Sequence, residues 1–583
     1  MNEKLLDVKN LCISFEKNSK QVRAVDSINF HINAGECLGI VGESGSGKSL
    51  TALSIMRLIA EEAVSSISGS IHFSLKDTAT NLMEVPLNEM YKWRGKRIGM
   101  VFQEPMSSLN PVINCGKQIQ EAVQLHQQLN ATQAKSRTLE LLSDVQIQQT
   151  ASVYSAYPHE LSGGQKQRVM IAMALAGNPS LLIADEPTTS LDVTVQREIL
   201  ELLVQLQMKQ NMSMLFITHD FGVLTKIADR AIVMKSGSIV EENSIVNLLN
   251  APVHPYTKAL INCRIPLNNR YSKLPTLQQN TAGTIISTDE RAARLKQLYA
   301  QEPLLTIENL SAKYTRTSSV LGFQKEQVLA LKNINLAIYP GETFGIVGES
   351  GSGKSTLGKC IVGLVHPSEG NINYYQKSIN TLNNKELRNW RKEIQYVFQD
   401  PFSALNPKMS IGEAIMEPLV AHTILKTDAD RKARVLHLLS LVGLHESQFR
   451  RLPHEFSGGE RQRICIARAL AMNPKILICD ESVSALDVSI QAQIINLLND
   501  LKVEFGFSLI FISHDINIVR YISDRIMVLH KGEVEEVNDS DVLCFQPNKE
   551  YTKQLLAAVP KGTVEEYLET QDKKKSILAT HDN

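Results

Sequence analysis

The chain carries the same eight-residue loop twice, Gly-Glu-Ser-Gly-Ser-Gly-Lys-Ser at residues 42–49 and again at residues 348–355. A loop of the form G-x-x-x-x-G-K-[ST] between a strand and a helix wraps the phosphates of a nucleotide. Its glycines let backbone N–H groups turn towards the phosphates, its lysine reaches the β- and γ-phosphates, and its last hydroxyl ligates Mg²⁺. The two loops are therefore the first candidates for binding chemistry.

The segments on either side of each loop fit this interpretation. Residues 37–41 and 343–347 are short apolar runs suited to a buried strand, and residues 49–56 and 355–362 can continue as helices. A single copy could be a glycine-rich turn, but two identical copies in the same context favour phosphate binding.

An acidic pair ends a second apolar run in each half. Asp185 and Glu186 follow residues 181–184, and Asp480 and Glu481 follow residues 476–479. Carboxylates at the C-terminal end of a parallel strand emerge where α/β sheets bind ligands. The first acid can hold the metal shell and the second can polarise an attacking water. A single pair could instead cap the following helix, but the pair occurs in both halves.

A histidine and a glutamine recur at matching places. His219 and His514 each lie 33 positions after the second acid, at the end of another strand-like run. A lone histidine is usually structural, whereas this repeated spacing favours a contact with the γ-phosphate. Gln103 and Gln399 stand between the loop and the acidic pair, where a glutamine could sense the metal and the attacking water.

A Ser-Gly-Gly signature opens a helical stretch in each half, at residues 162–165 and 457–460. The free N–H groups and the dipole of a helix N-terminus bind anions, although the motif alone is a weak signal. Signatures, acidic pairs and histidines repeat at an offset of 295 positions, but the loops repeat at 306. The first half therefore has 11 extra residues before its signature, and we expect them near residues 76–83.

Composition limits the classes of function. Lys and Arg total 61, and so do Asp and Glu, so the 583-residue chain has no formal net charge and gives no support to sequence-independent nucleic-acid binding. No stretch approaches the roughly 18 apolar residues of a membrane-spanning helix. The start lacks the apolar core of a secretory signal, so we expect a cytosolic protein. The eight cysteines form no C-x-x-C pair and are interpreted as reduced thiols.

In their order along the chain, these motifs resemble the nucleotide-binding domain of ABC ATPases, including Ser190-Leu-Asp192 and Ala485-Leu-Asp487 before the histidines. The resemblance covers about residues 5–262 and 304–558. It implies an α/β fold with two tandem P-loop NTPase domains, each with a RecA-like core, an antiparallel β subdomain and a helical signature subdomain. It also implies ATP and Mg²⁺ as cofactors, and two domains of one chain that form the ATPase dimer head to tail.

The resemblance assigns a role to each matching residue, with each ATP between the phosphate loop of one domain and the signature of the other. One site would use Gly42, Ser44, Gly45, Ser46, Gly47, Lys48, Ser49, Gln103, Asp185, Glu186 and His219 with Ser457, Gly458, Gly459 and Glu460. The other would use Gly348, Ser350, Gly351, Ser352, Gly353, Lys354, Ser355, Gln399, Asp480, Glu481 and His514 with Ser162, Gly163, Gly164 and Gln165. The catalytic residues would be Glu186, His219, Glu481 and His514. The Mg²⁺ residues, partly through water, would be Ser49, Gln103, Asp185, Ser355, Gln399 and Asp480. Adenine would stack on Phe15 and Tyr314.

Both halves keep the lysine, the second acid and the histidine, so two hydrolytic sites are predicted. The second half departs from the family pattern at two positions. Glu460 replaces the commoner glutamine of the signature, and Ser482 replaces the proline that often follows the acidic pair. These departures predict a modest difference in rate between the sites.

Two further patterns narrow the branch of the family. The Gln loops at residues 103–111 and 399–407 resemble those of oligopeptide, dipeptide and nickel importers. The Pro…Tyr-Thr-x-x-Leu pattern at residues 255–260 and 547–555 resembles the C-terminal extension of the same branch, although a local turn and helix start would also produce it. Both domains in one chain resemble the layout of glutathione-type and microcin C-type peptide importers.

This resemblance implies a bacterial ATPase subunit that energises import of peptides or related small solutes. It would lie on the cytoplasmic face of the inner membrane as a peripheral protein. Its partners would be two transmembrane permease subunits and, through them, a periplasmic or lipid-anchored substrate-binding protein, without nucleic acid. The particular substrate is not written in this sequence.

Two segments fall outside the repeated domains. Residues 263–303 are predicted to be a partly ordered linker that keeps the domains at high effective concentration, with a helix candidate at residues 289–299. Residues 559–583 are predicted to be a polar, flexible tail. The lysine run at residues 573–575 could touch anionic lipid, but a solvated tail is the simpler interpretation.

Other ATPases remain as alternatives. A nickel importer or an exporter ATPase with separate membrane chains would share most of these motifs. Soluble translation factors with twin ABC domains have a long charged connector, unlike the short mixed one here, and DNA-repair ATPases would show zinc-binding cysteine clusters. Both are weaker alternatives for this chain.

Overall fold

The computed structural model describes residues 3–17, 20–60, 64–75, 78–103, 108–189, 191–266, 269–277, 279, 281–317, 325–484 and 486–581. Residues 104–107 of the first Gln loop, Ser190 and Ala485 lie outside the described residues. The chain divides into two units. The first comprises Met1–Leu191, Val195–Asn262 and Pro560–Asn583, and the second comprises Asp192–Thr194 and Cys263–Val559.

The centre of the first unit is a six-stranded sheet with the strand order β10-β9-β3-β8-β7-β6. All neighbouring strands are parallel except β9 and β10, which form an antiparallel pair. Strands β3, β7 and β8 are buried along their whole length, which explains their continuous apolar sequences. The strands are β3 (Cys37–Val41), β6 (Ile98–Val101), β7 (Leu181–Asp185), β8 (Ser213–Thr218), β9 (Arg230–Lys235) and β10 (Ser238–Ser244).

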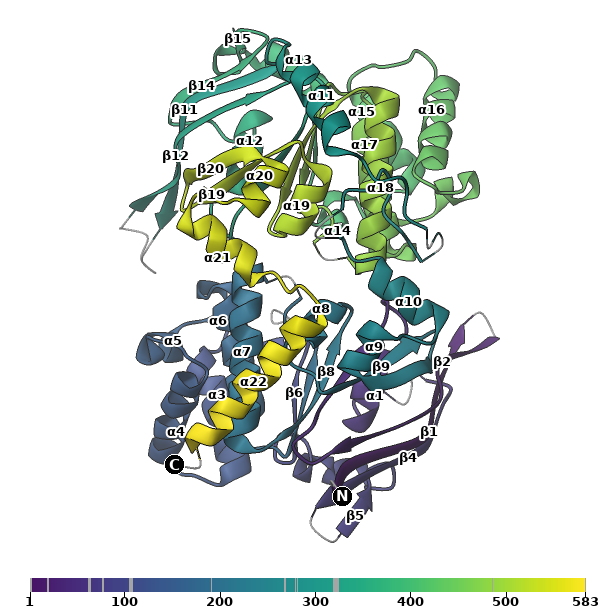
Figure 1. The fold of residues 1–583 in the computed structure, drawn as a ribbon, viewed down its shortest axis with the longest axis vertical. Coiled ribbons are helices and arrows are strands. Elements are labelled where there is room, and N and C mark those ends of the chain that lie inside the picture. The colour runs from purple at the N-terminus through teal and green to yellow at the C-terminus, as the bar shows by residue number, and fades with distance from the viewer. Residues whose placement is uncertain are drawn as a thin grey trace. The chain divides into compact units, whose positions relative to one another are not determined.

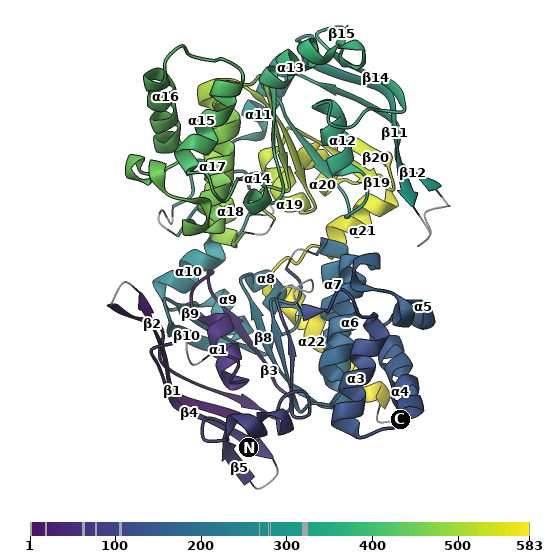
Figure 2. The same cartoon turned by 180° about the vertical axis from the view of Figure 1, so that it is seen from behind.

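An antiparallel sheet and a helical group lie at opposite ends of this central sheet (Figures 1 and 2). The antiparallel sheet has the order β2-β1-β4-β5, with β1 (Lys4–Lys17), β2 (Lys20–Asn33), β4 (Ser66–Leu75) and β5 (Thr78–Asn81). The helical group packs around α6, beside β6. It consists of α3 (Cys115–Gln127), α4 (Ala131–Asp144), α5 (Thr150–Ser155) and α6 (Gly163–Leu175).

The remaining helices of the first unit follow strands of the central sheet or cover it. They are α1 (Lys48–Ile55), α7 (Val193–Gln210), α8 (Phe221–Leu224), α9 (Ile245–Asn250), α10 (Pro255–Asn262) and α22 (Val564–His581). Short 3₁₀ helices span Leu87–Lys92 and Pro158–Glu160.

The second unit repeats this plan. Its central sheet has the order β16-β17-β18-β13-β19-β20 and its antiparallel sheet the order β12-β11-β14-β15. The central strands are β13 (Thr343–Val347), β16 (Ile394–Val397), β17 (Ile476–Asp480), β18 (Ser508–Ser513), β19 (Arg525–His530) and β20 (Glu533–Asp539). The antiparallel strands are β11 (Leu305–Thr317), β12 (Lys325–Ile338), β14 (Glu369–Tyr374) and β15 (Lys377–Ser378).

The second unit has helices that match those around the first central sheet, and it adds α11 (Thr288–Tyr299) before its first strand and α13 (Asn384–Glu393) before β16. Its other helices are α12 (Lys354–Ile361), α14 (Pro401–Ala404), α15 (Ile411–Ala421), α16 (Asp428–Leu441), α17 (Gly458–Leu470), α18 (Val488–Phe505), α19 (Ile516–Ile522), α20 (Ser540–Phe545) and α21 (Glu550–Ala558). Short 3₁₀ helices span Ile379–Thr381, Glu446–Arg450 and Pro453–Glu455. Two copies of one three-part α/β architecture confirm the predicted fold class.

The units differ most in one β-hairpin. Strands β4 and β5 of the first unit have 10 and 4 residues, whereas β14 and β15 of the second have 6 and 2. Strand β5 of the longer hairpin covers residues 78–81, within the segment 76–83 where the sequence predicted extra residues in the first half.

Residues of the predicted linker form an ordered part of the second unit. Helix α11 holds two arginines that form ion pairs with buried or half-buried carboxylates. Arg294 pairs with Asp524 at 2.7 Å, and Arg291 pairs with Asp539 at 2.8 Å. Asp524 also accepts a hydrogen bond from the backbone N–H of Thr343, the first residue of β13. The linker helix is therefore tied to the strand that leads into the second phosphate loop.

The C-terminal residues, expected to be a flexible polar tail, contain helix α22 in this structure. Glu566 is buried and pairs with Lys226 at 2.7 Å, and it accepts a hydrogen bond from Thr225 at 3.0 Å. Lys574, also buried, pairs with Asp229 at 3.0 Å. Two charged residues of this polar segment are thus buried, and each is paired with an opposite charge, as buried charges generally are.

Replacing Glu566 by alanine is expected to detach α22. Removing one partner of a buried ion pair typically costs about 3–5 kcal/mol because the other charge is left uncompensated. Hydrogen exchange of residues 564–581 should rise sharply. The exposed neighbour Glu569 supplies the matched control, and Glu569→Ala should leave the exchange of the helix unchanged. Equal protection in the two variants would show that Glu566 does not hold the helix.

Among the described residues, none of the helices combines the length and the apolar character that crossing a bilayer requires.

Candidate functional site

The first phosphate loop connects the end of β3 to the start of α1. Gly45 and Gly47 have φ angles of 79° and 101°, in the left-handed region that side chains disfavour. A Cβ atom at Gly47 would also lie 2.8 Å from the carbonyl oxygen of Ala24. In the second unit, Gly351 and Gly353 adopt the same conformation, with φ angles of 79° and 105°. The glycine spacing therefore reflects a real backbone requirement at these positions.

The loop lysine is buried in each half and donates hydrogen bonds to its own loop. Lys48 Nζ donates to the carbonyl oxygens of Gly42 and Glu43 at 2.8 and 2.9 Å. Lys354 Nζ makes the matching bonds to Gly348 and Glu349 at 2.7 and 2.8 Å. Each ammonium group is thus held at the centre of its loop.

The last hydroxyl of each loop meets the first acid of the pair. Ser49 Oγ donates to Asp185 Oδ1 at 3.0 Å, and Ser355 Oγ donates to Asp480 Oδ1 at 3.0 Å. Burial raises the pKa of Asp185 to about 6; the Ser49 hydrogen bond opposes this rise and the charge of Glu186 adds to it. Burial also raises the pKa of Asp480. Both predicted metal positions are therefore formed by side chains far apart in sequence.

Glu186, the second acid of the first half, contacts the predicted glutamine, histidine and lysine of the same half. Glu186 Oε2 accepts a hydrogen bond from Gln103 Nε2 at 3.2 Å and lies 3.3 Å from His219 Nδ1. Its Oε1 atom lies 3.8 Å from Lys48 Nζ. Thr189, which the sequence analysis did not select, donates to Oε2 at 3.0 Å.

The backbone of this acid is strained in both halves. Glu186 and Glu481 each have a φ angle of 45°, which is uncommon for a residue other than glycine. Strain of this kind persists only where the surrounding structure enforces it, and it is concentrated at functional sites. The conformation is the same in the two units, although Pro187 follows one acid and Ser482 follows the other.

Electrostatics keep the second acid ionised. Burial opposes the ionisation of Glu186, but the hydrogen bond and charge of His219, with the charge of Lys48, lower its pKa to about 2. The pKa of Glu481 is lowered against the same burial by His514 and Lys354. Burial tends to lower the pKa of His514, but the hydrogen bond and charge of Glu481 raise it. Each half therefore presents an anionic carboxylate beside a lysine and a histidine.

The second half repeats the contacts of the glutamine, the histidine and the lysine, and it adds one contact to the first acid. Gln399 Nε2 donates to Glu481 Oε2 at 2.6 Å, and His514 Nδ1 lies 3.6 Å from the same oxygen. Lys354 Nζ lies 3.8 Å from Glu481 Oε1. The addition is Tyr396, whose hydroxyl donates to Asp480 Oδ2 at 2.5 Å.

The signature motifs begin helices α6 and α17. Ser162 and Ser457 are the N-cap residues, and Gln165 and Glu460 complete a capping box with them. Glu460 differs from Gln165 in that it also accepts the hydroxyl hydrogen of Ser457, at 2.9 Å. The substitution therefore keeps the cap but adds a carboxylate beside the predicted anion site.

The predicted adenine-stacking residues occupy matching strands of the antiparallel sheets. Phe15, on β1, is partly buried and packs against the core of the first unit. Tyr314, on β11, is 41% exposed, and its hydroxyl lies within hydrogen-bonding distance of Thr356 Oγ1 at 3.4 Å. Their role in adenine binding stays a prediction.

Two tyrosines reach the phosphate loops from the C-terminal extensions. The hydroxyl of Tyr256 accepts a hydrogen bond from the backbone N–H of Glu43 at 3.3 Å, and that of Tyr551 accepts from Glu349 N–H at 3.4 Å. In the sequence, the surrounding Tyr-Thr motif indicated only the branch of the family. The repeated motif was nevertheless the signal that could have identified these positioning residues.

Removing these hydroxyls is expected to loosen the loops. Tyr256→Phe and Tyr551→Phe should each weaken ATP binding about fivefold, since a neutral hydrogen bond contributes about 1 kcal/mol. Equilibrium titration with ATP measures the effect. Tyr91→Phe changes an exposed tyrosine elsewhere in the first unit and is the control. Wild-type affinity in both loop variants would contradict a positioning role.

The residues fit a nucleotide with Mg²⁺. Ser46 Oγ and Ser352 Oγ are buried in the loops without a hydrogen-bond partner in the described part of the chain, so a phosphate oxygen can satisfy them. Mg²⁺ is typically bound by one or two carboxylates, substrate phosphates and water. The serine and carboxylate oxygens at each loop match that donor set. No three or more His, Cys, Asp or Glu side chains of the described residues are grouped so that they could hold a metal ion.

Comparison with known proteins agrees with this geometry. The family described as ABC transporter matches residues 25–189 and 331–484, and the family described as oligopeptide/dipeptide transporter, C-terminal region, matches residues 240–289. The chain is 43% identical over 564 residues to the glutathione import ATP-binding protein GsiA of Pectobacterium atrosepticum, which covers 96% of this chain and 90% of that protein.

Two further relatives carry the same name. Identity is 43% over 564 residues with GsiA of Escherichia coli strain K12 and 44% over 563 residues with GsiA of Salmonella typhimurium. Each alignment covers 95% of this chain and 89% of the relative. The chain therefore belongs to the ABC transporter family, as an ATPase with two nucleotide-binding domains and an oligopeptide/dipeptide-type C-terminal region.

Proposed function

We propose that this chain is the ATPase subunit of a bacterial importer that takes up short peptides of the glutathione class through separate permease subunits. One observation carries the proposal that both halves hydrolyse ATP. In each half, a strained, anionic glutamate contacts the loop lysine, the Gln-loop glutamine and the histidine. The peptide class rests on the relatives that are named for glutathione import.

The proposed roles follow from these contacts. Lys48 and Lys354 bind the phosphates, and the Ser49–Asp185 and Ser355–Asp480 pairs hold Mg²⁺, which neutralises charge on the phosphates when bound. Glu186 and Glu481 accept a hydrogen bond from the attacking water and orient it. The glutamines hold these carboxylates beside the metal and the attacking water, and the histidines hold the same carboxylates and contact the γ-phosphate.

The signature residues have a proposed role in the same reaction. Ser162 and Ser457 stand at helix N-termini, where backbone N–H groups favour a phosphate. The family resemblance predicts that each signature serves the nucleotide bound by the phosphate loop of the other half. That pairing and the roles of Phe15 and Tyr314 remain proposals.

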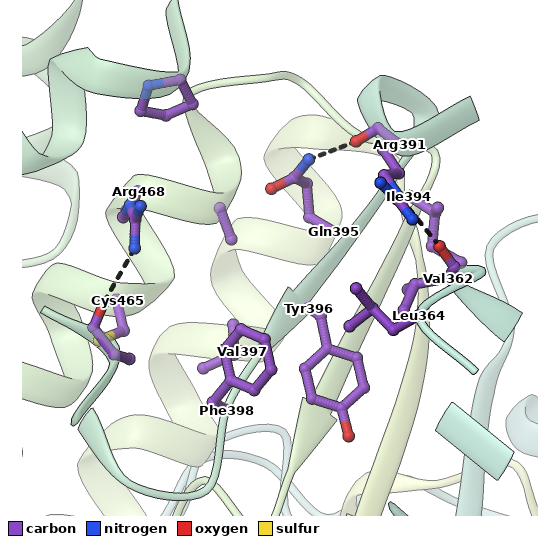
Figure 3. Close-up of a pocket in the computed structure, with 13 residues that line it drawn as sticks. Val362, Leu364, Arg391, Ile394, Gln395, Tyr396, Val397, Phe398, Cys465 and Arg468 are labelled. Carbon is purple, nitrogen blue, oxygen red and sulfur yellow. Dashed lines mark hydrogen bonds between the residues drawn. The ribbon is translucent and has the colours of Figure 1, made fainter. Parts of the chain in front are cut away.

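A pocket beside the second Gln loop is the candidate surface for a permease subunit. It has a volume of about 230 Å³ and lies between the end of β16 and helices α15 and α17. Figure 3 shows Phe398, which directly precedes Gln399, in its wall near Cys465. Phe398 is 42% exposed, so a short apolar helix of a permease can cover it. A displacement of this wall would be transmitted to Glu481 through the hydrogen bond that Gln399 donates to it.

The proposed permease contact implies a location for this chain. A subunit bound to an inner-membrane permease is held peripherally at its cytoplasmic face, and a substrate-binding protein would deliver the peptide from the other side. In this arrangement the ATPase supplies energy and the permease and binding protein supply specificity.

Uptake measurements test the proposed cargo. Cells that express this chain with its permease and binding protein should accumulate labelled glutathione or short peptides, and the variant Lys48→Ala/Lys354→Ala should not. Labelled Ni²⁺ serves as the comparison cargo. Uptake of Ni²⁺ alone would contradict the peptide proposal, and efflux of peptide that depends on the two lysines would indicate an exporter.

A further inference from the structure

The two metal-binding carboxylates do not have the same neighbours. Asp480 accepts a hydrogen bond on each oxygen, from Ser355 on Oδ1 at 3.0 Å and from Tyr396 on Oδ2 at 2.5 Å. At the position that corresponds to Tyr396, the first half has Met100 on β6. Each of these residues directly precedes a Val-Phe-Gln sequence, at residues 101–103 and 397–399. A thioether has no hydrogen to donate to Asp185.

A second substitution makes room for this tyrosine. Gly358 on α12 faces Tyr396, and a Cβ atom there would lie 3.0 Å from Tyr396 Cε2 and 3.3 Å from its Oη. The corresponding residue of α1 is Ala52, which is fully buried. The tyrosine thus occurs with glycine in the second half, and the methionine with alanine in the first.

We infer that Tyr396 is a positioning residue that fixes the Asp480 carboxylate for Mg²⁺ in the second nucleotide site, and that the first site lacks this restraint. The inference rests on the proposed metal-binding role of Asp480. With Oδ2 held by the phenol, Oδ1 stays directed at Ser355, the hydroxyl that shares the metal shell. Asp185 is held by Ser49 at the matching place, without a phenol.

The ring of Tyr396 also connects the site to the surface. It lines the pocket beside the second Gln loop, and in Figure 3 its hydroxyl points away from Gln395 and Arg391. One side chain therefore contacts both the candidate permease surface and the metal-binding carboxylate.

Binding of Mn²⁺ with a non-hydrolysable ATP analogue, followed by electron paramagnetic resonance, tests the inference without relying on turnover. Tyr396→Phe keeps the ring and removes only the hydroxyl. One of the two Mn²⁺ sites per chain should weaken about tenfold, because the hydrogen bond from the phenol to the charged carboxylate is lost. Met100→Leu in the first half should change neither site. Mn²⁺ binding of Tyr396→Phe equal to or tighter than wild type would overturn the inference.

The glycine supplies an independent test in which Tyr396 stays chemically intact. Gly358→Ala should displace the ring and weaken the same Mn²⁺ site. In a chain that carries Tyr396→Met, which copies the first half, Gly358→Ala should have no further effect. An equal loss in both backgrounds would mean that the glycine acts through something other than the tyrosine.

Asp480→Asn separates this inference from the proposed role on which it rests. If Asp480→Asn leaves both Mn²⁺ sites intact, the proposed metal role of Asp480 fails. If Asp480→Asn removes one site while Tyr396→Phe matches wild type, only the role of Tyr396 fails. Thermal unfolding of each variant shows that any loss is measured on folded protein.

Discussion

The double variant Glu186→Gln/Glu481→Gln is expected to hydrolyse ATP at least about 100-fold more slowly than wild type, the lower end of what a positioned general base contributes. Glutamine has nearly the same shape as glutamate but lacks the negative charge that orients water. That charge is maintained in a buried site, where His219 and Lys48 hold the pKa of Glu186 at about 2. Phosphate release at saturating ATP measures the rate.

Each single variant should lose the contribution of its own half while still binding ATP. The lysines, the loop glycines and the Ser–Asp pairs are unchanged, so equilibrium titration should show two nucleotides per chain. Glu569→Gln, at an exposed position of α22, is the control for removal of one carboxylate. If Glu481→Gln kept wild-type hydrolysis, the prediction of two hydrolytic sites would fail for the second half.

The sequence predicted those parts of the site that depend on local order. Each phosphate loop has to join a buried strand to a helix, and each acidic pair has to follow a parallel strand, so motif and context identify Lys48 and Asp185 together. Parallel strands β3 and β7 then end at the same edge of the sheet, which brings residues 136 positions apart within 3.0 Å. Local patterns and the rules of parallel sheets were sufficient there.

Contacts without a local pattern could not be predicted in this way. Tyr396 lies 84 positions from Asp480, and Tyr256 lies 213 positions from Glu43. A tyrosine in a strand is usually a packing residue, so the residue type alone does not indicate a hydrogen bond to a functional carboxylate. The available signal was a comparison of the two halves, in which Met100 and Ala52 change together to Tyr396 and Gly358.

The C-terminal segment shows a different limit of prediction from composition. Composition indicated a solvated tail because Lys and Glu are normally exposed. Here Glu566 and Lys574 are buried and find Lys226 and Asp229 in a distant part of the chain. A contact between residues more than 300 positions apart cannot be predicted from a short stretch of sequence. The structure therefore makes this tail part of the first unit.

Lys48→Ala is expected to weaken ATP binding at the first loop about 10- to 100-fold, because a hydrogen bond to a charged group contributes about 1.5–3 kcal/mol. Lys48 is 4% exposed, holds the carbonyl groups of Gly42 and Glu43, and faces Glu186 at 3.8 Å. Its removal withdraws the charge that binds phosphate and leaves the Glu186 carboxylate to repel it. Calorimetric titration should therefore show one tight nucleotide per chain in place of two. Lys117→Ala removes an exposed cation from helix α3 of the first unit and should keep both. Two tight sites in Lys48→Ala would mean that the backbone N–H groups of the loop bind phosphate without the lysine.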